Sequence, residues 1–216
     1  ETVASAGSER IRLGSLEIDL LNDELLARLA AIKGLCPHFH TSLQSGSDTV
    51  LKRMNRRYDT AGYTRIIGNI RRLFKDVSIT TDIIVGFPGE TEEEFSESKA
   101  FCEKTGFYKI HVFPYSRREG TKAAAMENQI QEDVKKRRAA EMAKVGARLY
   151  DDFRSRQIGR KHSVLFETYE GGFCFGHTEN YLYVKAPSDI SLKNITADVI
   201  ITGTDGEFCL CSIAKP

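Results

Sequence analysis

The sequence predicts an α/β protein in which a partial β/α barrel is followed by a small all-β barrel. Up to Tyr115, short apolar runs alternate with amphipathic helical patterns, as expected of parallel strands joined by helices. A basic helical stretch comes next, and after Gly159 the composition changes to short β-branched and aromatic runs separated by turns. We therefore expect three parts: a partial barrel over residues 1–127, a connecting helix over 128–157 and a small barrel over 158–216.

The first predicted β/α unit covers residues 11–34. Residues 11–16 are typical of a short strand, and Asn22 is well placed to cap the helix that follows. Gly34 is expected to end this helix, because glycine tolerates the left-handed conformation found at helix ends. The apolar residues of the helix share one face: Leu25, Leu26, Leu29 and Ile32.

The second unit repeats this plan. A strand over residues 36–43 leads through a QSGS turn to a helix bearing Val50, Leu51 and Met54, and a further helix follows Thr60. The strands that come after it cover residues 77–85 and 107–115, which gives three clear repeats and one partial repeat.

The most informative segment is TTDIIVGFPGET at residues 80–91. Its continuous apolar residues are typical of a parallel strand covered on both faces, and its two glycines let the backbone approach a ligand closely. Thr91 and Glu94 form a capping box, which starts a helix that runs to about Lys104. This layout builds cofactor sites, and a plain strand-to-helix connection shows the same pattern.

The C-terminal part predicts a small barrel of five strands, at residues 162–169, 173–176, 181–185, 195–201 and 207–213. Turn residues separate these runs, as in all-β folds.

Composition fits this organisation. The 216 residues are 41% hydrophobic and 28% charged, which suits one sizeable domain or two smaller ones. No apolar run approaches the roughly 18 residues of a membrane helix, and the first eight residues lack the regions of a signal peptide. We expect no membrane association and a cytoplasmic location.

Five cysteines are spread along the chain: Cys36, Cys102, Cys174, Cys209 and Cys211. Only the last two are close, at a spacing of two that points both side chains the same way on a strand. These spacings give no disulfide framework, and small apolar packing residues in a reducing compartment explain them.

His38 and His40 lie on one face of a predicted strand, because they are two residues apart. No third ligand lies at a natural spacing, so hydrogen bonding inside a polar barrel mouth explains the pair better than a metal site. We predict no metal ligand in this chain.

Four motifs resemble, in the same order, those of the radical S-adenosylmethionine methylthiotransferases. They are HFHTSLQSGSD at residues 38–48, LKRMNRRY at 51–58, TTDIIVGFPGET at 80–91 and HVFPYSRREGT at 111–121. The resemblance implies a barrel of six β/α units, of which this chain holds three and a part. It also implies insertion of a methylthio group into an adenosine next to the tRNA anticodon, or into an aspartate of a ribosomal protein.

Such enzymes use S-adenosylmethionine and four-iron, four-sulfur clusters, and a Cys-x3-Cys-x2-Cys loop leaves one iron open for the cofactor. The sequence lacks this loop. We expect the cluster ligands outside this chain, and we expect the chain to be the C-terminal part of a longer enzyme, inactive without its N-terminal part. The resemblance identifies no catalytic residue in this part.

The resemblance places S-adenosylmethionine at the carboxyl ends of the strands, where barrel sites assemble. Ile84 is expected to be an apolar contact of the adenine ring and Gly86 the residue of close approach. Gln44 and Ser45 are expected at the ribose or the methionine part. The predicted cofactor-binding residues are Gln44, Ser45, Asp82, Ile84, Gly86, Phe113 and Tyr115.

Positive charge is concentrated in the connecting region. Residues 117–161 hold 13 Lys and Arg against 7 Asp and Glu, a net charge of +6 against +1 for the chain, so the remainder carries about −5. Attraction to RNA phosphate explains this pattern, and so does a basic helix face in solvent.

The segment GHTENYLYV at residues 176–184 resembles the C-terminal RNA-binding domain called TRAM, in particular that of the branch acting on N6-threonylcarbamoyladenosine at position 37 of tRNA. Small β-barrels stack unpaired bases on exposed rings; Phe173, Phe175, Tyr181 and Tyr183 are candidates, although alternation turns half of such residues to the core. The predicted contacts to the tRNA anticodon stem-loop are Lys135, Lys136, Arg137, Arg138, Arg160, Lys161 and Tyr181.

Three alternatives remain open. The first is a methylthiotransferase for isopentenyladenosine tRNA or for a ribosomal protein. The second is another radical S-adenosylmethionine barrel, such as a porphyrin oxidase relative. The third is an RNA-binding module without catalysis.

Overall fold

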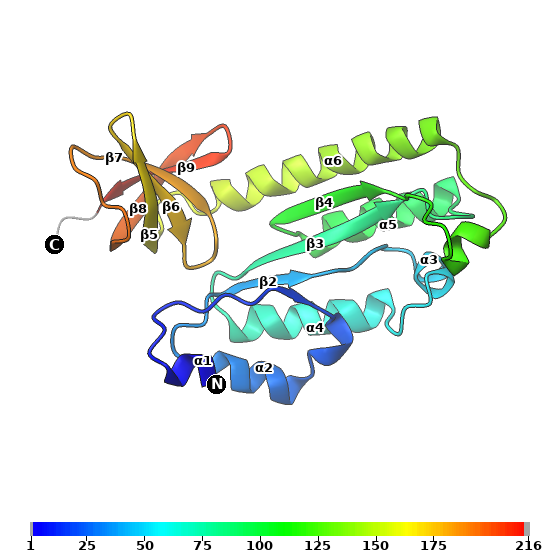
Figure 1. Ribbon diagram of the computed structural model, residues 1–216, viewed down its shortest axis with the longest axis horizontal. Helices are drawn as coiled ribbons and strands as arrows, with labels where there is room; N and C mark the ends of the chain where they lie inside the picture. Colours follow the sequence, from blue (N-terminus) through cyan, green and yellow to red (C-terminus); the bar gives the residue numbers. More distant parts are fainter. Residues whose placement is uncertain (1, 214–216) are drawn as a thin grey trace.

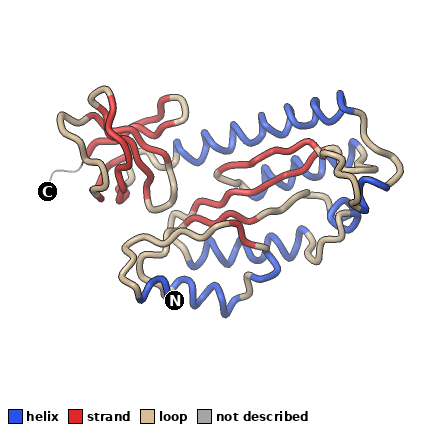
Figure 2. Tube along the Cα trace, viewed as in Figure 1, coloured by secondary structure: helices blue, strands red, loops and turns tan. Residues whose placement is uncertain are grey.

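The computed structural model describes residues 2–213, which form an open sheet and a closed barrel joined by one long helix (Figures 1 and 2). The predicted domain limits at residues 1 and 214–216 lie outside this range. The helices are α1 (Thr2–Ser5), α2 (Asp23–Ala30), α3 (Asp48–Arg53), α4 (Thr60–Leu73), α5 (Glu92–Thr105) and α6 (Glu132–Ser155), with 3-10 turns at Ile18–Leu20 and Lys122–Ala125. The strands are β1 (Ser15–Leu16), β2 (His38–Thr41), β3 (Ser78–Val85), β4 (Lys109–Pro114), β5 (Lys161–Glu170), β6 (Phe173–Thr178), β7 (Tyr183–Pro187), β8 (Thr196–Asp205) and β9 (Phe208–Ile213).

Strands β1 to β4 form one sheet in sequence order, and every neighbouring pair is parallel. Helices connect them on one side of the sheet, as in a β/α barrel. Strands β1 and β4 are the two edges, so the sheet is an open part of such a barrel. The expected partial barrel is therefore present.

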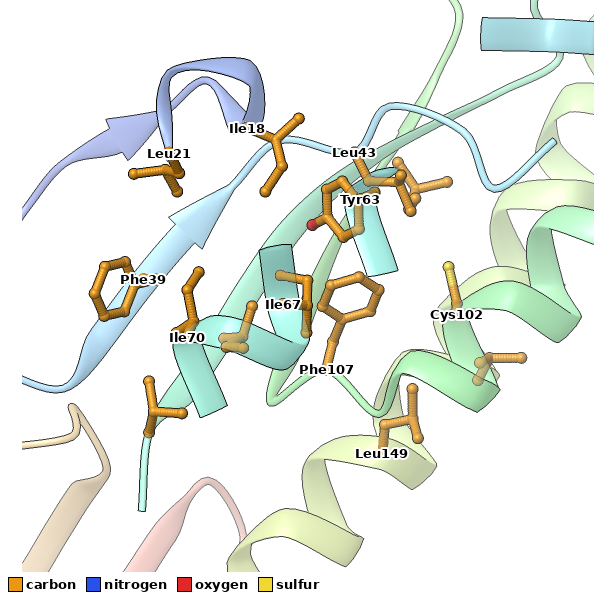
Figure 3. Close-up of a cluster of buried hydrophobic side chains, with 14 of the residues drawn as sticks. Ile18, Leu21, Phe39, Leu43, Tyr63, Ile67, Ile70, Cys102, Phe107 and Leu149 are labelled. Atoms are coloured by element: carbon orange, nitrogen blue, oxygen red, sulfur yellow. The ribbon is translucent and has the colours of Figure 1, made fainter. Parts of the chain in front are cut away.

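One face of the sheet packs against α2, α4, α5 and α6 and builds the larger hydrophobic core (Figure 3). Its buried side chains include Phe39, Tyr63, Ile67, Ile70, Ile83, Phe95, Cys102, Phe107, Met142 and Leu149. The other face carries polar residues at alternate positions. The strand register places His40, Thr80 and Lys109 in one row, and Asp82 beside His111.

Helix starts follow the predicted caps more closely than helix ends do. Asn22 accepts a hydrogen bond from the Leu25 amide, and Thr91 with Glu94 forms both bonds of the capping box. The prediction that Gly34 ends the first helix is wrong, because α2 ends at Ala30. Gly34 has φ of 83°, and a Cβ there would lie 2.6 Å from the carbonyl oxygen of Glu9, so packing against the preceding loop requires this glycine.

The C-terminal strands close into a barrel in the order β5-β6-β7-β9-β8. All pairs are antiparallel except β7 with β9. Alternate residues point inward and fill the core, among them Val164, Phe166, Cys174, Val184, Val199, Ile201, Cys209 and Cys211.

The small barrel sits at the amino ends of the sheet strands, where Figure 1 shows the tails of the β2, β3 and β4 arrows. Tyr108, just before β4, and Phe153 of α6 pack into the barrel core. The Asn180 side chain donates to the carbonyl of Asp76 at 2.9 Å, and Ser78 Oγ donates to the carbonyl of Asn180 at 2.5 Å. Polar and apolar contacts thus fix one unit against the other.

Within residues 2–213, no helix combines the length and the apolar character needed to cross a membrane.

Candidate functional site

The carboxyl ends of β2, β3 and β4 meet at one edge of the sheet. The Gln44 amide donates to the carbonyl of Asp82 at 2.9 Å, and the Ile84 amide donates to the carbonyl of Gln44 at 2.9 Å. On the other side of β3, the Tyr115 amide donates to the carbonyl of Val85 at 2.8 Å. The predicted neighbourhood of Gln44, Ile84 and Tyr115 is therefore present.

Gln44 and Ser45 differ in what they offer to a ligand. Gln44 has φ of 71° and lines a cavity of about 500 Å³ together with Ser42, Arg56 and Tyr58. Ser45 is fully buried, and its Oγ accepts from the Ser47 amide at 3.2 Å. Of the two residues, only Gln44 lines this cavity.

Asp82 and Ile84 lie on the face of β3 that no helix covers. Asp82 Oδ2 accepts from Ser42 Oγ at 2.8 Å and lies 3.1 Å from His40 Nε2. Ile84 is paired in register with Phe113, a residue that is 52% exposed. The two apolar side chains give this edge a surface suited to the face of a heteroaromatic ring.

The side chain of Lys135 packs so closely on position 86 that only glycine fits there. Its φ is 71°, and a Cβ at this position would lie 2.5 Å from Cγ of Lys135. Its amide donates to Glu90 Oε2 at 2.6 Å. The glycine therefore serves the packing of α6 on the turn, which is a different reason from the close ligand approach expected from the sequence.

Tyr115 packs against the 86–90 turn. Its ring packs edge-on against Phe87 with centroids 5.4 Å apart, and Nζ of Lys135 lies 5.4 Å from the ring centroid. The Tyr115 hydroxyl is buried and has no hydrogen-bond partner in the described chain. Burying a hydroxyl without a hydrogen-bond partner costs free energy.

Two of the six basic residues predicted to contact RNA are buried. Lys135 is 4% exposed and pairs with Glu132 at 2.7 Å, while Arg138 is 3% exposed and pairs with Glu90 at 2.8 Å. The Glu90 carboxylate thereby joins Arg138 to the Gly86 amide. These positions correct the expectation for Lys135 and Arg138, because both side chains are buried: Arg138 is paired with Glu90 of the 86–90 turn, and Lys135 is packed against Gly86 and paired with Glu132 of its own helix.

The other predicted cations lie at the surface. Lys136 is exposed, and Arg137 pairs with Glu92 at 2.5 Å and with Glu141 at 2.9 Å. Arg160 pairs with Asp76, and Lys161 pairs with Asp198 at 2.7 Å. Exposed ion pairs are weak, so these side chains are free to exchange their partners for phosphate.

Tyr181 belongs to a stack of rings between the small barrel and the sheet. The His177 ring stacks on Tyr181 with centroids 4.4 Å apart and on Tyr183 at 4.9 Å. The guanidinium of Arg12 lies 3.8 Å above the Tyr181 ring on its other side. Sequence reasoning missed Arg12 and His177, although His177 stands four residues before Tyr181 within the quoted GHTENYLYV segment.

His38 and His40 are hydrogen-bonded, as predicted. Nδ1 of His38 lies 2.8 Å from Ser78 Oγ, and Nδ1 of His40 lies 2.9 Å from Thr80 Oγ1. Burial lowers the pKa of His38 to about 4, and the charge of Arg12 adds to the effect. His38 is therefore neutral at pH 7.

The described cysteines do not fit an iron–sulfur cluster. All five are free, four are buried, and no group of three His, Cys, Asp or Glu within residues 2–213 is arranged to hold a metal ion. Burial raises the pKa of Cys102 and Cys211 to about 12, which keeps these thiols protonated, whereas cluster ligands are thiolates.

Comparisons with known proteins agree with the four motifs. Residues 4–102 match the family model described as the radical SAM superfamily. A threonylcarbamoyladenosine tRNA methylthiotransferase MtaB of Thermotoga maritima is 41% identical over 177 residues, which are 82% of this chain and 41% of the relative. The MtaB of Bacillus subtilis is 35% identical, covering 94% of this chain and 47% of the relative. A tRNA-2-methylthio-N(6)-dimethylallyladenosine synthase of Symbiobacterium thermophilum is 38% identical, covering 92% and 43%.

Solved structures support the fold. Coproporphyrinogen III oxidase (HemN) of Escherichia coli, described as a radical SAM enzyme, superposes with a TM-score of 0.54 at 12% identity, over 89% of this chain and 46% of that one. The chain spans less than half the length of the curated relatives quoted above. From its motifs, its partial barrel and these relatives, the chain belongs to the radical S-adenosylmethionine methylthiotransferase family, whose cofactors are S-adenosylmethionine and four-iron, four-sulfur clusters.

Proposed function

We propose that this chain is the C-terminal part of a tRNA methylthiotransferase that modifies carbon 2 of N6-threonylcarbamoyladenosine at position 37. The similarity to relatives named for tRNA methylthiolation carries this proposal. Relatives named for threonylcarbamoyladenosine and for dimethylallyladenosine have overlapping identities, 35–41% and 38–39%. The choice between the two substrates therefore depends on the TRAM-like segment at residues 176–184.

The carboxyl edge of the sheet fits part of S-adenosylmethionine. Ile84 and Phe113 offer apolar surface for the adenine, Gln44 lines the adjoining cavity, and Tyr115 follows β4 at the same edge. Asp82 is held in place by Ser42 and His40. When bound, this cofactor supplies the methyl group and the hydrogen-abstracting chemistry of the family. The residues named here bind and orient it and keep water from its apolar side.

The remaining barrel strands and the cluster cysteines belong, in this proposal, to the portion of the relatives that this chain does not span. Both edge strands of the sheet, β1 and β4, have one side without a neighbour, which further strands would pair. The chain alone is then inactive, and the N-terminal part of the same enzyme is its partner.

The small barrel is the TRAM-like unit of this proposal, and the anticodon stem-loop of tRNA is its substrate. The exposed cations Lys136, Arg137, Arg160 and Lys161 provide contacts to phosphate, and Tyr181 is the RNA contact expected on the small barrel. A tRNA substrate places the enzyme in the cytoplasm.

The nucleosides of cellular tRNA test the proposal. In cells that lack the complete gene, mass spectrometry should show loss of 2-methylthio-N6-threonylcarbamoyladenosine and accumulation of its unmethylthiolated precursor. The intact gene should restore the modification, and the Ile84→Asn variant should restore much less. Leu20→Asn, at a 62% exposed position, is the matched control and should behave as the intact gene. A change confined to isopentenyl derivatives would overturn the substrate, and an unchanged profile would overturn the activity.

A further inference from the structure

The cavity of about 500 Å³ beside Gln44 lies at the carboxyl ends of β1 and β2. Residues that directly follow the two strands line it, among them Glu17 after β1 and Ser42 after β2. The turn between α3 and α4 contributes Arg56 and Arg57. Active sites of β/α barrels lie at this end of the strands, so further strands that pair with β1 would extend the wall of the cavity and would not fill it.

The turn that carries the two arginines is fixed in position. Asn55 adopts φ of 57°, the left-handed conformation in which many helices end. The Tyr58 hydroxyl lies 3.0 Å from the carbonyl oxygens of Ser42 and Leu43, and this contact joins the turn to the end of β2. The backbone of both arginines is therefore in place before a ligand binds, which lowers the entropy lost on binding.

The charged side chains of the cavity have no partners of their own. Arg56 and Arg57 are exposed, and within residues 2–213 neither side chain makes an ion pair or a hydrogen bond. Glu17 and Asp19 also line the cavity and are likewise unpaired in the described chain. Two arginines against two carboxylates suit a ligand that has both an anionic group and hydrogen-bond donors. A planar guanidinium binds a carboxylate through two parallel hydrogen bonds.

The two nucleosides in the names of the relatives differ in the group on N6. A threonylcarbamoyl group has a free carboxylate, which is charged at pH 7, together with N–H and O–H donors. A dimethylallyl group is a hydrocarbon and has neither. Because N6 and carbon 2 belong to the same six-membered ring, the group on N6 lies beside the carbon that receives the methylthio group. A residue that binds the threonyl carboxylate must therefore lie next to the cofactor edge, as this cavity does.

Two carboxylates meet at this edge when both ligands are bound, because the methionine part of S-adenosylmethionine also has one. Burial raises the pKa of Tyr58, and the positive charge of Arg56 acts in the opposite direction. Arg56 therefore lies near the Tyr58 hydroxyl at the end of β2. This position assigns Arg56 to the cofactor and leaves Arg57 for the second carboxylate.

We propose that Arg57 binds the carboxylate of the threonylcarbamoyl group and thereby selects this substrate over dimethylallyladenosine. The inference rests on the proposed function, because it concerns the substrate of the same reaction. It gives the choice of substrate a basis in the partial barrel, independent of the TRAM-like segment. Arg57 contacts the group on N6 and no reacting atom, so it is a specificity residue.

Binding of anticodon stem-loops to the complete, cluster-loaded enzyme tests this role. Three fluorescein-labelled loops are compared, with N6-threonylcarbamoyladenosine, N6-dimethylallyladenosine or adenosine at position 37. Arg57→Gln should weaken binding of the first loop about tenfold, the usual effect of losing a hydrogen bond to a charged group, and should change binding of the other two less than about twofold. Arg57→Lys keeps the charge without the paired donors, so its effect should be intermediate.

A change in the ligand tests the same contact. A loop whose threonyl carboxylate is converted to a methyl ester should bind the native enzyme about tenfold more weakly, and Arg57→Gln should not weaken its binding further. Lys52→Gln removes an exposed charge on α3 outside the cavity and should leave the preference among the loops unchanged. Thermal melting identifies any variant that fails to fold.

Calorimetric titration with S-adenosylhomocysteine separates the two carboxylates, and Arg57→Gln should bind it like the native enzyme. A folded Arg57→Gln variant that loses this binding and keeps the preference for the threonylcarbamoyl loop would assign Arg57 to the cofactor and overturn the inference. A folded variant that is native in both measurements would also overturn it. Equal binding of the threonylcarbamoyl and dimethylallyl loops by the native enzyme would do the same. The nucleoside profile decides the proposed function separately, so that function can stand where this inference fails.

Discussion

Glu94 at the start of α5 is a carboxylate held in its charged form by its neighbours. Arg53 donates to both of its oxygens, at 2.9 and 2.5 Å, and Thr49 Oγ1 donates at 2.6 Å. Burial alone would raise the pKa of Glu94, but these hydrogen bonds and the Thr91 amide outweigh burial and lower the pKa to about 2. The interaction ties α5 to α3.

The depressed pKa of Glu94 predicts a specific acid sensitivity. The unfolded-state pKa of a glutamate is about 4.3, so the stabilisation is fully present above about pH 5 and is lost as the pH falls towards 2. Glu94→Gln keeps the capping geometry and removes the charge, so it should lower stability at pH 7 and flatten the loss of stability between pH 5 and 2. Urea unfolding at a series of pH values measures both effects. Glu93→Gln, at an exposed neighbouring position, is the control, and equal slopes for the two variants would contradict the prediction.

A count of charges along α6 does not show which of its basic residues are exposed and which are buried. The KKRR run predicted a basic surface, yet Lys135 and Arg138 are buried. The spacing of Lys135 and Arg138 predicts their burial, although the count of charges does not. They share a helix face with the apolar residues Met142, Val145 and Leu149. Helical periodicity assigns these two cations to the packed face, but the partner Glu90 belongs to a turn more than 40 residues away and is visible only in the fold.

At the scale of elements, β6 contains a glycine that only close backbone packing explains. A Cβ on Gly176 would overlap the carbonyl oxygen of Leu165 and lie 2.7 Å from Cα of Phe166. The strand pairing of β5 and β6 shifts register just beyond this point, between Phe166 and Thr168. The backbones are therefore in contact where the barrel bends.

Gly176→Ala should destabilise the small barrel by about 1–3 kcal/mol, the range for overpacked interiors, because the atoms it meets are main-chain atoms that cannot rotate away. Urea unfolding followed by circular dichroism measures the change. Gly203→Ala in β8 is the matched control, since its Cβ would meet only Cδ1 of Leu210, at 3.9 Å. A destabilisation as large in Gly203→Ala as in Gly176→Ala would contradict the argument.

The elements themselves were largely predictable from local patterns. Apolar runs gave β2, β3 and β4, and the side chains of Asn22 and Thr91 marked the starts of α2 and α5. The end of α2 was less predictable. Glycine is required at position 34 by close contact with the backbone of Glu9, and not by the end of the helix. A helix start depends on hydrogen bonds between residues three positions apart, so the local sequence predicts it. A glycine such as Gly34 depends on contacts with residues distant in the sequence, which the local sequence does not reveal.

At the scale of the whole molecule, the placement of the two units decides how the sites are related. The sequence predicted both units and the meeting of the strand ends at Gln44, Ile84 and Tyr115. It did not predict that the small barrel packs at the amino ends of the strands, because the contacts responsible join residues far apart in the chain. Arg10, for example, donates to the carbonyls of Ser163 and His177 at 2.6 and 3.0 Å.

The same placement predicts that the two cores unfold together. Phe153 extends from α6 into the barrel core beside Tyr108, with ring centroids 4.9 Å apart, while Met142 and Leu149 of the same helix lie in the sheet core. Loss of this ring should cost about 3–5 kcal/mol, the usual cost of a buried Phe→Ala change, and α6 should transmit the loss to both units. In Phe153→Ala, hydrogen exchange measured by mass spectrometry should therefore accelerate in peptides of β3 as well as of β8.

Ile158→Ala, at a 47% exposed position just beyond α6, is the matched control and should leave exchange in both units unchanged. Acceleration confined to β8 in Phe153→Ala would show that the barrel opens on its own while the sheet stays closed. In that case α6 would be a tether between independent units. Joint acceleration means that the small barrel and the sheet form one cooperative unit, because the cores of both depend on the packing of the same helix.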